Sequence, residues 1–392
     1  MSERLLAFVN GWVFTPAEAI DKGVVLVKGR RIAAVGAQRQ VHIPSDAKII
    51  DLSGSIVAPG FIDMHVHGGG GADVTEGTER VFRKLSLFEV RHGVTSFVAS
   101  VLTVPDDQLY RILDVASSLC TSGSLPGAGL LGIHLEGPYL AVEERGAHPE
   151  SLLRNPDPVH YTPLLEYAET MRVVTLAPEL PGATELVRKL SERGVVAAAG
   201  HTNAIARQIL PVIDAGLRHA THMFCNMSHF RRDNLKRVAG AVETFLFDDR
   251  VTTELIADGH HLGPTLMKLT VKVKGPGAVC FVTDAMPAAG MPDGIYEIGG
   301  VQAVVRDGAA RLLDGSAYAG SVTTMDVCVR NGVELIGLSP RVAVQMATET
   351  PARILGIDDH KGRIAEGMDA DLVVLDRSLR VVHTIIGGEI VV

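Results

Sequence analysis

Short apolar runs alternate with amphipathic segments through the middle of the chain. Eight such runs are separated by stretches of helical periodicity, for example 80–91 and 183–193. The runs are Phe61–Val66, Thr95–Val101, Leu130–Leu135, Val173–Ala177, Val195–Ala199, His219–Phe224, Glu254–Ala257 and Val279–Val282. Alternating strands and helices favour a parallel sheet, and eight strands favour a closed barrel. We therefore predict an α/β fold with a (β/α)8 TIM barrel over residues 58–350. Within this range, a β-hairpin insert at 286–320 is expected after the last barrel strand.

A doubly wound open sheet is the alternative architecture. It requires a glycine-rich phosphate turn after the first strand, and Gly68–Gly71 lacks the G-x-G-x-x-G spacing into a helix. The two ends of the chain instead show short β-runs broken by turn residues. Each end is too short to bury a core alone. We expect residues 1–57 and 351–392 to form one small β-sandwich domain, split between the termini.

Composition and charge exclude several classes of protein. The net charge is −8 with no basic tract, which argues against nucleic acid and anionic membranes as partners. No apolar window approaches the ~20 residues of a membrane helix. The four cysteines are scattered, and no secretory signal pattern is evident, so a cytoplasmic location is expected. The 15 histidines and 41 glycines point to an enzyme with tight backbone turns.

Residue types that ligate metals follow the apolar runs. They are Asp63, His65, His67, Glu136, His201, His222 and Asp284. The carboxyl ends of barrel strands converge on one mouth, where active sites lie. One histidine at a strand end is commonly structural, but five or six polar groups together are costly to bury as packing. His65 and His67 share one strand face because side chains alternate with a period of two.

The chemistry of this set favours a catalytic metal site. Imidazoles beside a carboxylate suit a divalent transition metal with an open coordination position. From the residues alone, Asp284 is either a final ligand, a general base, or both. His148 and His261 lie in loops, where histidines are commonly solvated, and the residues alone assign them no role.

Longer motifs resemble a known family. Asp63-x-His65-x-His67 after Ala58–Ile62, together with the closing stretch 362–376, resembles the amidohydrolase superfamily. Within it, the segments around the candidate residues are similar to the N-acetylglucosamine-6-phosphate deacetylases. These segments are 134–138, 146–149, 200–202, 221–224, 257–261, 282–285 and 319–321. The resemblance spans the barrel in order, and it implies a metal-dependent barrel hydrolase with a split β-sandwich.

The resemblance also implies roles for individual residues. It makes Glu136, His201 and His222 ligands of the main metal, with Asp284 as the general acid and base. It makes His148 a donor to the amide carbonyl and His261 a contact to the sugar or its phosphate. The retained pair His65 and His67 allows a second metal, with Glu136 as a bridge. Further substrate contacts are expected from Cys225, Asn226, Arg232, Gly320 and Ser321.

One departure from the family pattern concerns the substrate. Where the family commonly reads Asn-Ala-Met, this chain reads Cys225-Asn226-Met227. Replacing the amide by a thiol removes a strong hydrogen-bond donor, so the sequence does not decide whether the 6-phosphate is recognised. Arg231 or Arg232 can supply a compensating charge, across a homodimer as the family arrangement suggests. The alternative for these arginines is a solvated basic turn.

We therefore expect hydrolysis of the N-acetyl amide of N-acetylglucosamine 6-phosphate, giving glucosamine 6-phosphate and acetate. One or two divalent ions are expected, with zinc first and iron, cobalt or manganese as alternatives. A deacylase of an unphosphorylated or galacto-configured amino sugar is one alternative function. A cyclic-amide hydrolase or ring deaminase is another, and a catalytically silent scaffold is the third. The expected partners are a small-molecule amino sugar and a second copy of the chain.

Overall fold

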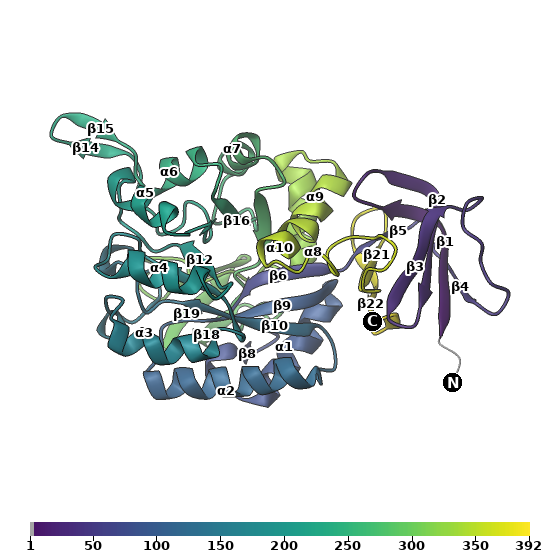
Figure 1. Cartoon of the computed structure of the whole chain (residues 1–392), viewed down its shortest axis with the longest axis horizontal. Coiled ribbons are helices and arrows are strands. Elements are labelled where there is room, and N and C mark those ends of the chain that lie inside the picture. Colours follow the sequence, from purple (N-terminus) through teal and green to yellow (C-terminus); the bar gives the residue numbers. More distant parts are fainter. Residues whose placement is uncertain (1–3) are drawn as a thin grey trace.

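A computed structural model describes residues 4–392, and its larger part is a parallel eight-stranded barrel (Figure 1). The strand order is β6-β9-β10-β11-β12-β13-β16-β17, and every neighbouring pair is parallel. The strands are β6 (Phe61–Val66), β9 (Val94–Val101), β10 (Gly129–Glu136), β11 (Met171–Leu176), β12 (Val196–Ala199), β13 (His219–Ala220), β16 (Thr252–Ile256) and β17 (Val279–Val282). The predicted α/β barrel is confirmed.

The barrel closes between its first and last strands through a few polar contacts. The backbone N–H of Asp284 donates to the carbonyl of His65 at 2.8 Å. The hydroxyl of Thr283 donates to the buried Asp63 carboxylate at 2.5 Å. Asp63, on β6, thus holds the end of β17 beside the strand that carries His65.

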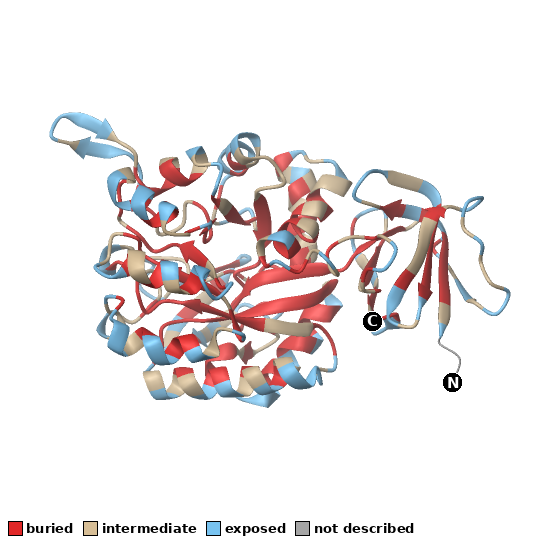
Figure 2. Ribbon diagram, viewed as in Figure 1, coloured by how far each residue is buried: buried red, intermediate tan, exposed pale blue. Residues whose placement is uncertain are grey.

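Helices cover the outside of the barrel, with apolar faces turned toward the strands (Figure 2). The α-helices are α1 (Glu79–Arg91), α2 (Asp106–Ser122), α3 (Pro158–Leu164), α4 (Ala183–Ser191), α5 (Ala206–Asp214), α6 (Ala241–Phe247), α7 (Pro264–Lys274), α8 (Met325–Asn331), α9 (Pro340–Met346) and α10 (Glu349–Ile354). Shorter turns are η1 (Val74–Glu76), η2 (Val142–Glu144), η3 (Glu150–Leu152), η4 (Leu165–Tyr167) and η5 (Gly332–Ile336). Helix α2 ends at Ser122 and is followed by Gly123, whose φ of 58° favours glycine.

A second sheet joins strands from both ends of the chain (Figure 1). Its order is β23-β22-β21-β5-β1-β2-β3, with β4 paired to β1. The strands are β1 (Leu5–Phe14), β2 (Ala19–Lys28), β3 (Arg31–Ala37), β4 (Lys48–Asp51), β5 (Ile56–Pro59), β21 (Leu372–Leu375), β22 (Val381–Ile386) and β23 (Glu389–Ile390). This mixed sheet confirms the predicted partnership of the termini. The domain limits at residues 57 and 351 remain a prediction.

Three small sheets extend the loops at the mouth of the barrel. They are β7 (Gly68–Gly69) with β8 (Ala72–Asp73), β14 (Arg231–Asp233) with β15 (Lys236–Val238), and β18 (Gly294–Ile298) with β19 (Val301–Arg306) and β20 (Ala309–Leu312). The predicted two-stranded insert at 286–320 is therefore wrong in detail, because Ala309–Leu312 adds a third antiparallel strand. No helix of the described residues is both long and apolar enough to cross a bilayer.

Candidate metal centre and substrate rim

The barrel mouth brings six of the predicted side chains into one buried cluster. Each of the six is less than one-tenth exposed. Two of them lie on strands, and the other four lie in the turns just past a strand end. The six are His65, His67, Glu136, His201, His222 and Asp284. The cluster thus combines four imidazoles with two carboxylates at the end of the barrel where strands finish.

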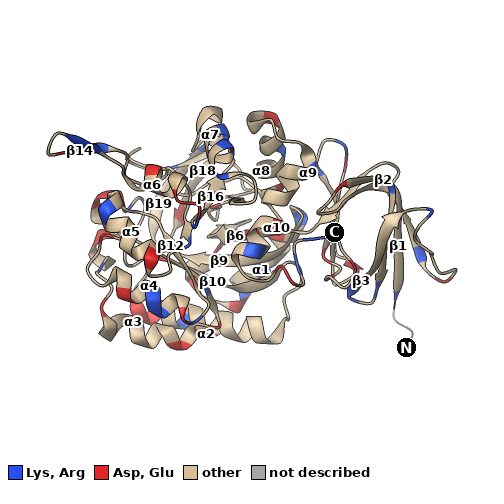
Figure 3. Cartoon of the chain, turned by 45° about the horizontal axis from the view of Figure 1, so that its top comes forward, with Lys and Arg blue, Asp and Glu red and all other residues tan. Residues whose placement is uncertain are grey.

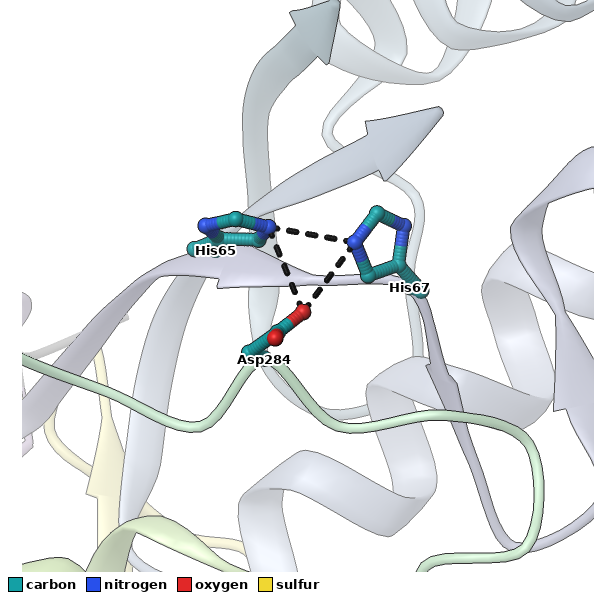
Figure 4. Close-up of side chains that lie close together, drawn as sticks. All are labelled: His65, His67 and Asp284. Atoms are coloured by element: carbon teal, nitrogen blue, oxygen red, sulfur yellow. Dashed lines mark hydrogen bonds and ion pairs between the residues drawn. The ribbon is translucent and has the colours of Figure 1, made fainter. Parts of the chain in front are cut away.

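One half of the cluster joins the His65–His67 pair to Asp284 (Figure 4). The Nε2 atoms of the two histidines lie 3.1 Å apart. The Oδ1 atom of Asp284 lies 3.4 Å from Nε2 of His65 and 3.2 Å from Nε2 of His67. These three side chains place one potential ligand atom each within 4.8 Å of the others.

The other half is centred on Glu136. Its Oε1 atom lies 3.1 Å from Nε2 of His201 and 3.0 Å from Nε2 of His222, and those two nitrogens are 3.1 Å apart. Its Oε2 atom lies 3.3 Å from Nε2 of His67. Glu136 therefore faces both halves of the cluster.

The backbone turns sharply at three of these residues. The φ angles are 48° at His201, 26° at His222 and 47° at Asp284, in the left-handed region that non-glycine residues avoid. Such conformations cost about 1–3 kcal/mol each and concentrate at functional sites. The turn also explains why β13 ends at Ala220, before the predicted limit at Phe224.

Hydrogen bonds fix the proton on two of the rings. His65 donates from Nδ1 to the Glu254 carboxylate at 2.8 Å, and His201 donates from Nδ1 to the Glu144 carbonyl at 2.8 Å. In the neutral rings the lone pairs therefore lie on the Nε2 atoms, which point into the cluster. The Nδ1 atoms of His67 and His222 are buried without a partner among the described residues.

The cluster attracts positive charge. Burial lowers the pKa of His67, but Asp284 and Glu136 outweigh burial and raise that pKa to about 9. The pKa of His65 is also raised well above its usual value, because Glu254, Asp284 and Glu136 overcome the effect of burial. A divalent cation satisfies the same demand while displacing protons. Imidazole nitrogens and carboxylate oxygens converging at this spacing fit one or two transition-metal ions.

His148 differs from His65 and His201 in which ring nitrogen carries the proton. The backbone N–H of Thr103 donates to its Nδ1 at 3.2 Å, so the neutral ring carries its proton on Nε2. Burial lowers the pKa of His148 to about 4 and keeps the ring neutral. Its Nε2 lies 3.4 Å from Oε2 of Glu136 and has no hydrogen-bond partner among the described residues. Although His148 is near enough to Glu136 and His201 to join a metal group, this ring presents a donor rather than a lone pair.

Two residues at the centre were missed by sequence reasoning. Glu254 is fully buried on β16 and contacts His65, and Thr103 holds the His148 ring. A glutamate inside an apolar parallel strand was the available signal for Glu254, since a buried carboxylate needs partners. No sequence signal marks Thr103, because its contact depends on how the loop folds.

The segment after His222 lies beside the centre, but the side chains of Cys225 and Asn226 point in different directions. Cys225 packs against the apolar cluster that includes Ile256 and Val282, and burial raises the pKa of its thiol. The Asn226 amide nitrogen lies 2.9 Å from the point where a Cβ at Gly146 would be. Asn226 therefore faces the loop that carries His148, while the Cys225 side chain faces the protein core.

Arg231 and Arg232 lie on a hairpin that projects from the barrel (Figure 3). Arg231 donates to the side-chain and backbone oxygens of Asn203, at 2.7 and 3.2 Å. Arg232 is exposed and pairs with Arg237 across the hairpin. Within one chain, neither arginine contacts the metal-centre residues in the described structure.

The remaining predicted rim residues lie on two loops, and the loop with Gly320 and Ser321 runs beside Asp284. His261 contacts the Asp258 carboxylate through Nδ1 at 2.7 Å, and its ring packs on Tyr318 with centroids 4.5 Å apart. At Gly320, with φ of 64°, a Cβ would lie 2.8 Å from the Asp284 carbonyl oxygen. The Ser321 hydroxyl donates to the Thr283 carbonyl at 2.6 Å, so its proton is already used inside the protein.

Comparison with known proteins places this site in a family. A family model for the amidohydrolase family matches residues 56–391. The chain is 35% identical to the N-acetylglucosamine-6-phosphate deacetylase of Bacillus subtilis, over 96% of this chain and 95% of that one. The chain belongs to the amidohydrolase family. This confirms the family resemblance.

Two further similar amidohydrolases are also deacetylases of N-acetyl amino-sugar phosphates by name. The N-acetylgalactosamine-6-phosphate deacetylase of Escherichia coli O157:H7 is 36% identical over 88% of this chain and 90% of that one. A mutant of the Mycobacterium smegmatis N-acetyl-D-glucosamine-6-phosphate deacetylase, solved in complex with N-acetyl-D-glucosamine 6-phosphate, superposes with a TM-score of 0.90. That structure is 36% identical, and the match covers 100% of both chains. This amidohydrolase is thus a hydrolase of the deacetylase type.

Proposed function

We propose that this amidohydrolase removes the acetyl group from N-acetylglucosamine 6-phosphate. Water and the amide give acetate and glucosamine 6-phosphate: a C–O bond forms and the C–N bond breaks. The observation that carries the proposal is the convergence of four imidazoles, Glu136 and Asp284 at the barrel mouth, with the neutral His148 donor beside them. The relatives that share most of the chain's length act, by name, on N-acetyl amino-sugar phosphates.

The metal centre would hold its ions through specific residues. Glu136, His201 and His222 are proposed ligands of the main ion, and His65 and His67 of a second ion beside Asp284. When bound here, a divalent ion would supply the chemistry of lowering the pKa of a water and polarising the amide carbonyl. The set of nitrogen and oxygen donors suits zinc first, with iron, cobalt or manganese as alternatives.

The other residues handle the proton and the developing charge. The Asp284 carboxylate has a lowered pKa: burial raises it, and the charges of His65, His67 and His222 outweigh burial. It is therefore ionised and able to accept the proton of the attacking water, then return it to the departing nitrogen. His148 donates from Nε2 to the carbonyl oxygen as it becomes negative.

Substrate recognition is proposed at the rim. His261 contacts the sugar or its 6-phosphate, and Asn226 takes the place of the amide that Cys225 does not provide. Arg232 reaches a substrate only from a partner subunit, consistent with its exposed position on a projecting hairpin. The homodimer and the cytoplasmic location stay predictions.

A galacto-configured substrate is the second candidate, because the E. coli relative is named for the galactosamine isomer. A deacetylation assay with N-acetylglucosamine 6-phosphate, its galacto-isomer and unphosphorylated N-acetylglucosamine separates the possibilities. We expect the highest kcat/KM for N-acetylglucosamine 6-phosphate. No acetate release from any of the three sugars would contradict the proposed function.

A further inference from the structure

Glu254 is a buried carboxylate in the middle of strand β16, and the mechanism above does not use it. Its side chain is fully buried. Its neighbours Leu255 and Ile256 are also buried and apolar. Removing a carboxylate from water is costly unless charged or hydrogen-bonding groups compensate. Packing alone therefore favours an apolar residue at this position, and the partners of Glu254 show what the carboxylate does.

Three hydrogen-bond partners surround the carboxylate. Its Oε2 atom lies 2.8 Å from Nδ1 of His65 and accepts the backbone N–H of His222 at 2.9 Å. Its Oε1 atom lies 3.3 Å from Nε2 of His219. Burial raises the pKa of Glu254, but the charges and hydrogen bonds of His65 and His219 outweigh burial and lower it well below the usual value.

The two contacts of Oε2 reach opposite halves of the metal centre. His65 belongs to the group with His67 and Asp284, whereas His222 lies beside Glu136 and His201. The bond to Nδ1 keeps the His65 proton away from Nε2, the atom that faces the centre. The bond to the His222 backbone holds a residue whose φ of 26° is otherwise unfavourable.

We propose that Glu254 is a positioning residue that aligns both halves of the metal centre through His65 and His222. The proposal rests on the ligand roles given under the proposed function. A carboxylate behind a ligating imidazole fixes its tautomer and orientation and raises its basicity. The Nδ1 atoms of His67 and His222 lack any such partner among the described residues, so the alignment of the rings depends on Glu254 and on the Glu144 carbonyl.

The test is the metal affinity of Glu254→Gln, measured with zinc against a competing chelator and by metal analysis after dialysis. Glutamine has nearly the same shape, and its amide oxygen can accept one set of bonds, but it lacks the negative charge. We expect the zinc affinity of the second-ion site, formed by His65 and His67, to fall about 10–100-fold, the range for partners of ligating histidines. The bound zinc should fall toward one ion per chain.

Two further variants separate positioning from general stability. Glu254→Asp keeps the charge but withdraws it by one methylene, so we expect a similar loss of zinc affinity. Glu89→Gln is the control for the loss of a buried carboxyl group, because Glu89 is also buried, on α1, and hydrogen bonds to none of the site histidines in the described structure. We expect it to retain the wild-type zinc content. Equal zinc loss in Glu89→Gln would assign the effect to stability and overturn the proposal.

A double-mutant comparison tests the route through His65. If Glu254 acts mainly through that ring, Glu254→Gln should weaken zinc binding much less in a His65→Ala background than in the wild type. Wild-type zinc affinity in Glu254→Gln and Glu254→Asp would overturn the proposal. Because zinc binding is measured without any sugar, this result is independent of whether the chain deacetylates N-acetylglucosamine 6-phosphate.

Discussion

The metal centre and the rim segment at residues 225–238, which follows His222, differ in how their side chains are held. The rings and carboxylates of the centre are buried, and each is approached by side chains from several strands. The rim segment is buried at Met227 and Ser228 but otherwise has half-buried and exposed side chains, with Phe230 62% and Leu235 83% exposed. Geometry at the centre is thus imposed by the barrel, whereas the exposed side chains of the rim are not held by the core.

This difference indicates which property each region controls. Rigid, buried groups suit the chemical step, because pre-positioned charges need no rearrangement during reaction. We propose that the exposed groups of the rim act in substrate choice. Changes at the centre should therefore lower kcat for every substrate, and changes at the rim should alter the ratio between substrates.

The largest effect is expected from removing a main-site ligand. His201→Ala takes away a ring whose proton is already fixed on Nδ1 by Glu144. The main ion and the activity should be lost together, with kcat falling beyond the roughly 10²–10⁴-fold that proton transfer alone contributes. Metal analysis and the acetate assay on one preparation check this. Full metal content in His201→Ala would refute the ligand assignment.

Asp284→Asn should have the next largest effect. The amide keeps the size of the side chain but cannot accept the proton from water, so kcat should fall about 10²–10⁴-fold. The ion held by Glu136, His201 and His222 should remain. If metal content at that site and turnover fall in equal proportion, Asp284 is a ligand of the main ion instead of the proton carrier.

His148→Asn should lower kcat about 10²–10³-fold, the usual loss for one donor to a developing oxyanion. Because burial brings the pKa of His148 to about 4, the neutral ring persists far below neutral pH. The ratio of wild-type to variant kcat/KM should therefore be the same at about pH 5 as at about pH 8. A ratio that changes between these values would show that the ring titrates in this range.

His67→Ala tests the second ion and should have a smaller effect. We expect the metal content to fall from two ions to one and kcat to fall about 10–100-fold, the range for residues that tune a metal site. A wild-type chain that holds a single ion in zinc-rich buffer, together with unchanged turnover in His67→Ala, would show that the main ion is sufficient.

Cys225→Asn should have the smallest effect, because the Cys225 side chain packs against the core at the edge of the rim. An amide at this position gains a strong donor only if it turns away from the core toward the substrate, and the preference for the 6-phosphate over the free sugar should then rise about tenfold, as for one charge-assisted hydrogen bond. The kcat/KM values for both sugars give the answer. No change in that preference would mean that Cys225, packed against the core, plays no part in recognition.

The sequence predicted the fold well because the barrel has a simple periodic signal. Strands β6 and β17 have the predicted limits, since apolar runs in parallel strands are buried on both faces. The third strand of the insert was missed because Ala309–Leu312 is short, with only two of its residues buried. The early end of β13 depends on the left-handed turn at His222, which residue type does not reveal.

The sequence predicted which residues gather at the site but not which ring nitrogens of the histidines carry protons. Strand-end positions identified the histidines and carboxylates that the barrel gathers. The contrast between His148 and His201 depends on one backbone N–H and one carbonyl, from Thr103 and Glu144, brought there by loops. Glu254 was not predicted because it lies within an apolar run that indicates only a buried strand. Its carboxylate nevertheless contacts both His65 and the backbone of His222.

The most direct test of the account is to remove and restore the metal while following acetate release from N-acetylglucosamine 6-phosphate. We predict that the metal-free chain is inactive and that stepwise addition of zinc restores activity in parallel with the ion bound. The Glu136→Ala variant, treated in the same way, should recover neither metal nor activity. Full activity in the metal-free chain, or in Glu136→Ala, would contradict a metal-dependent deacetylase.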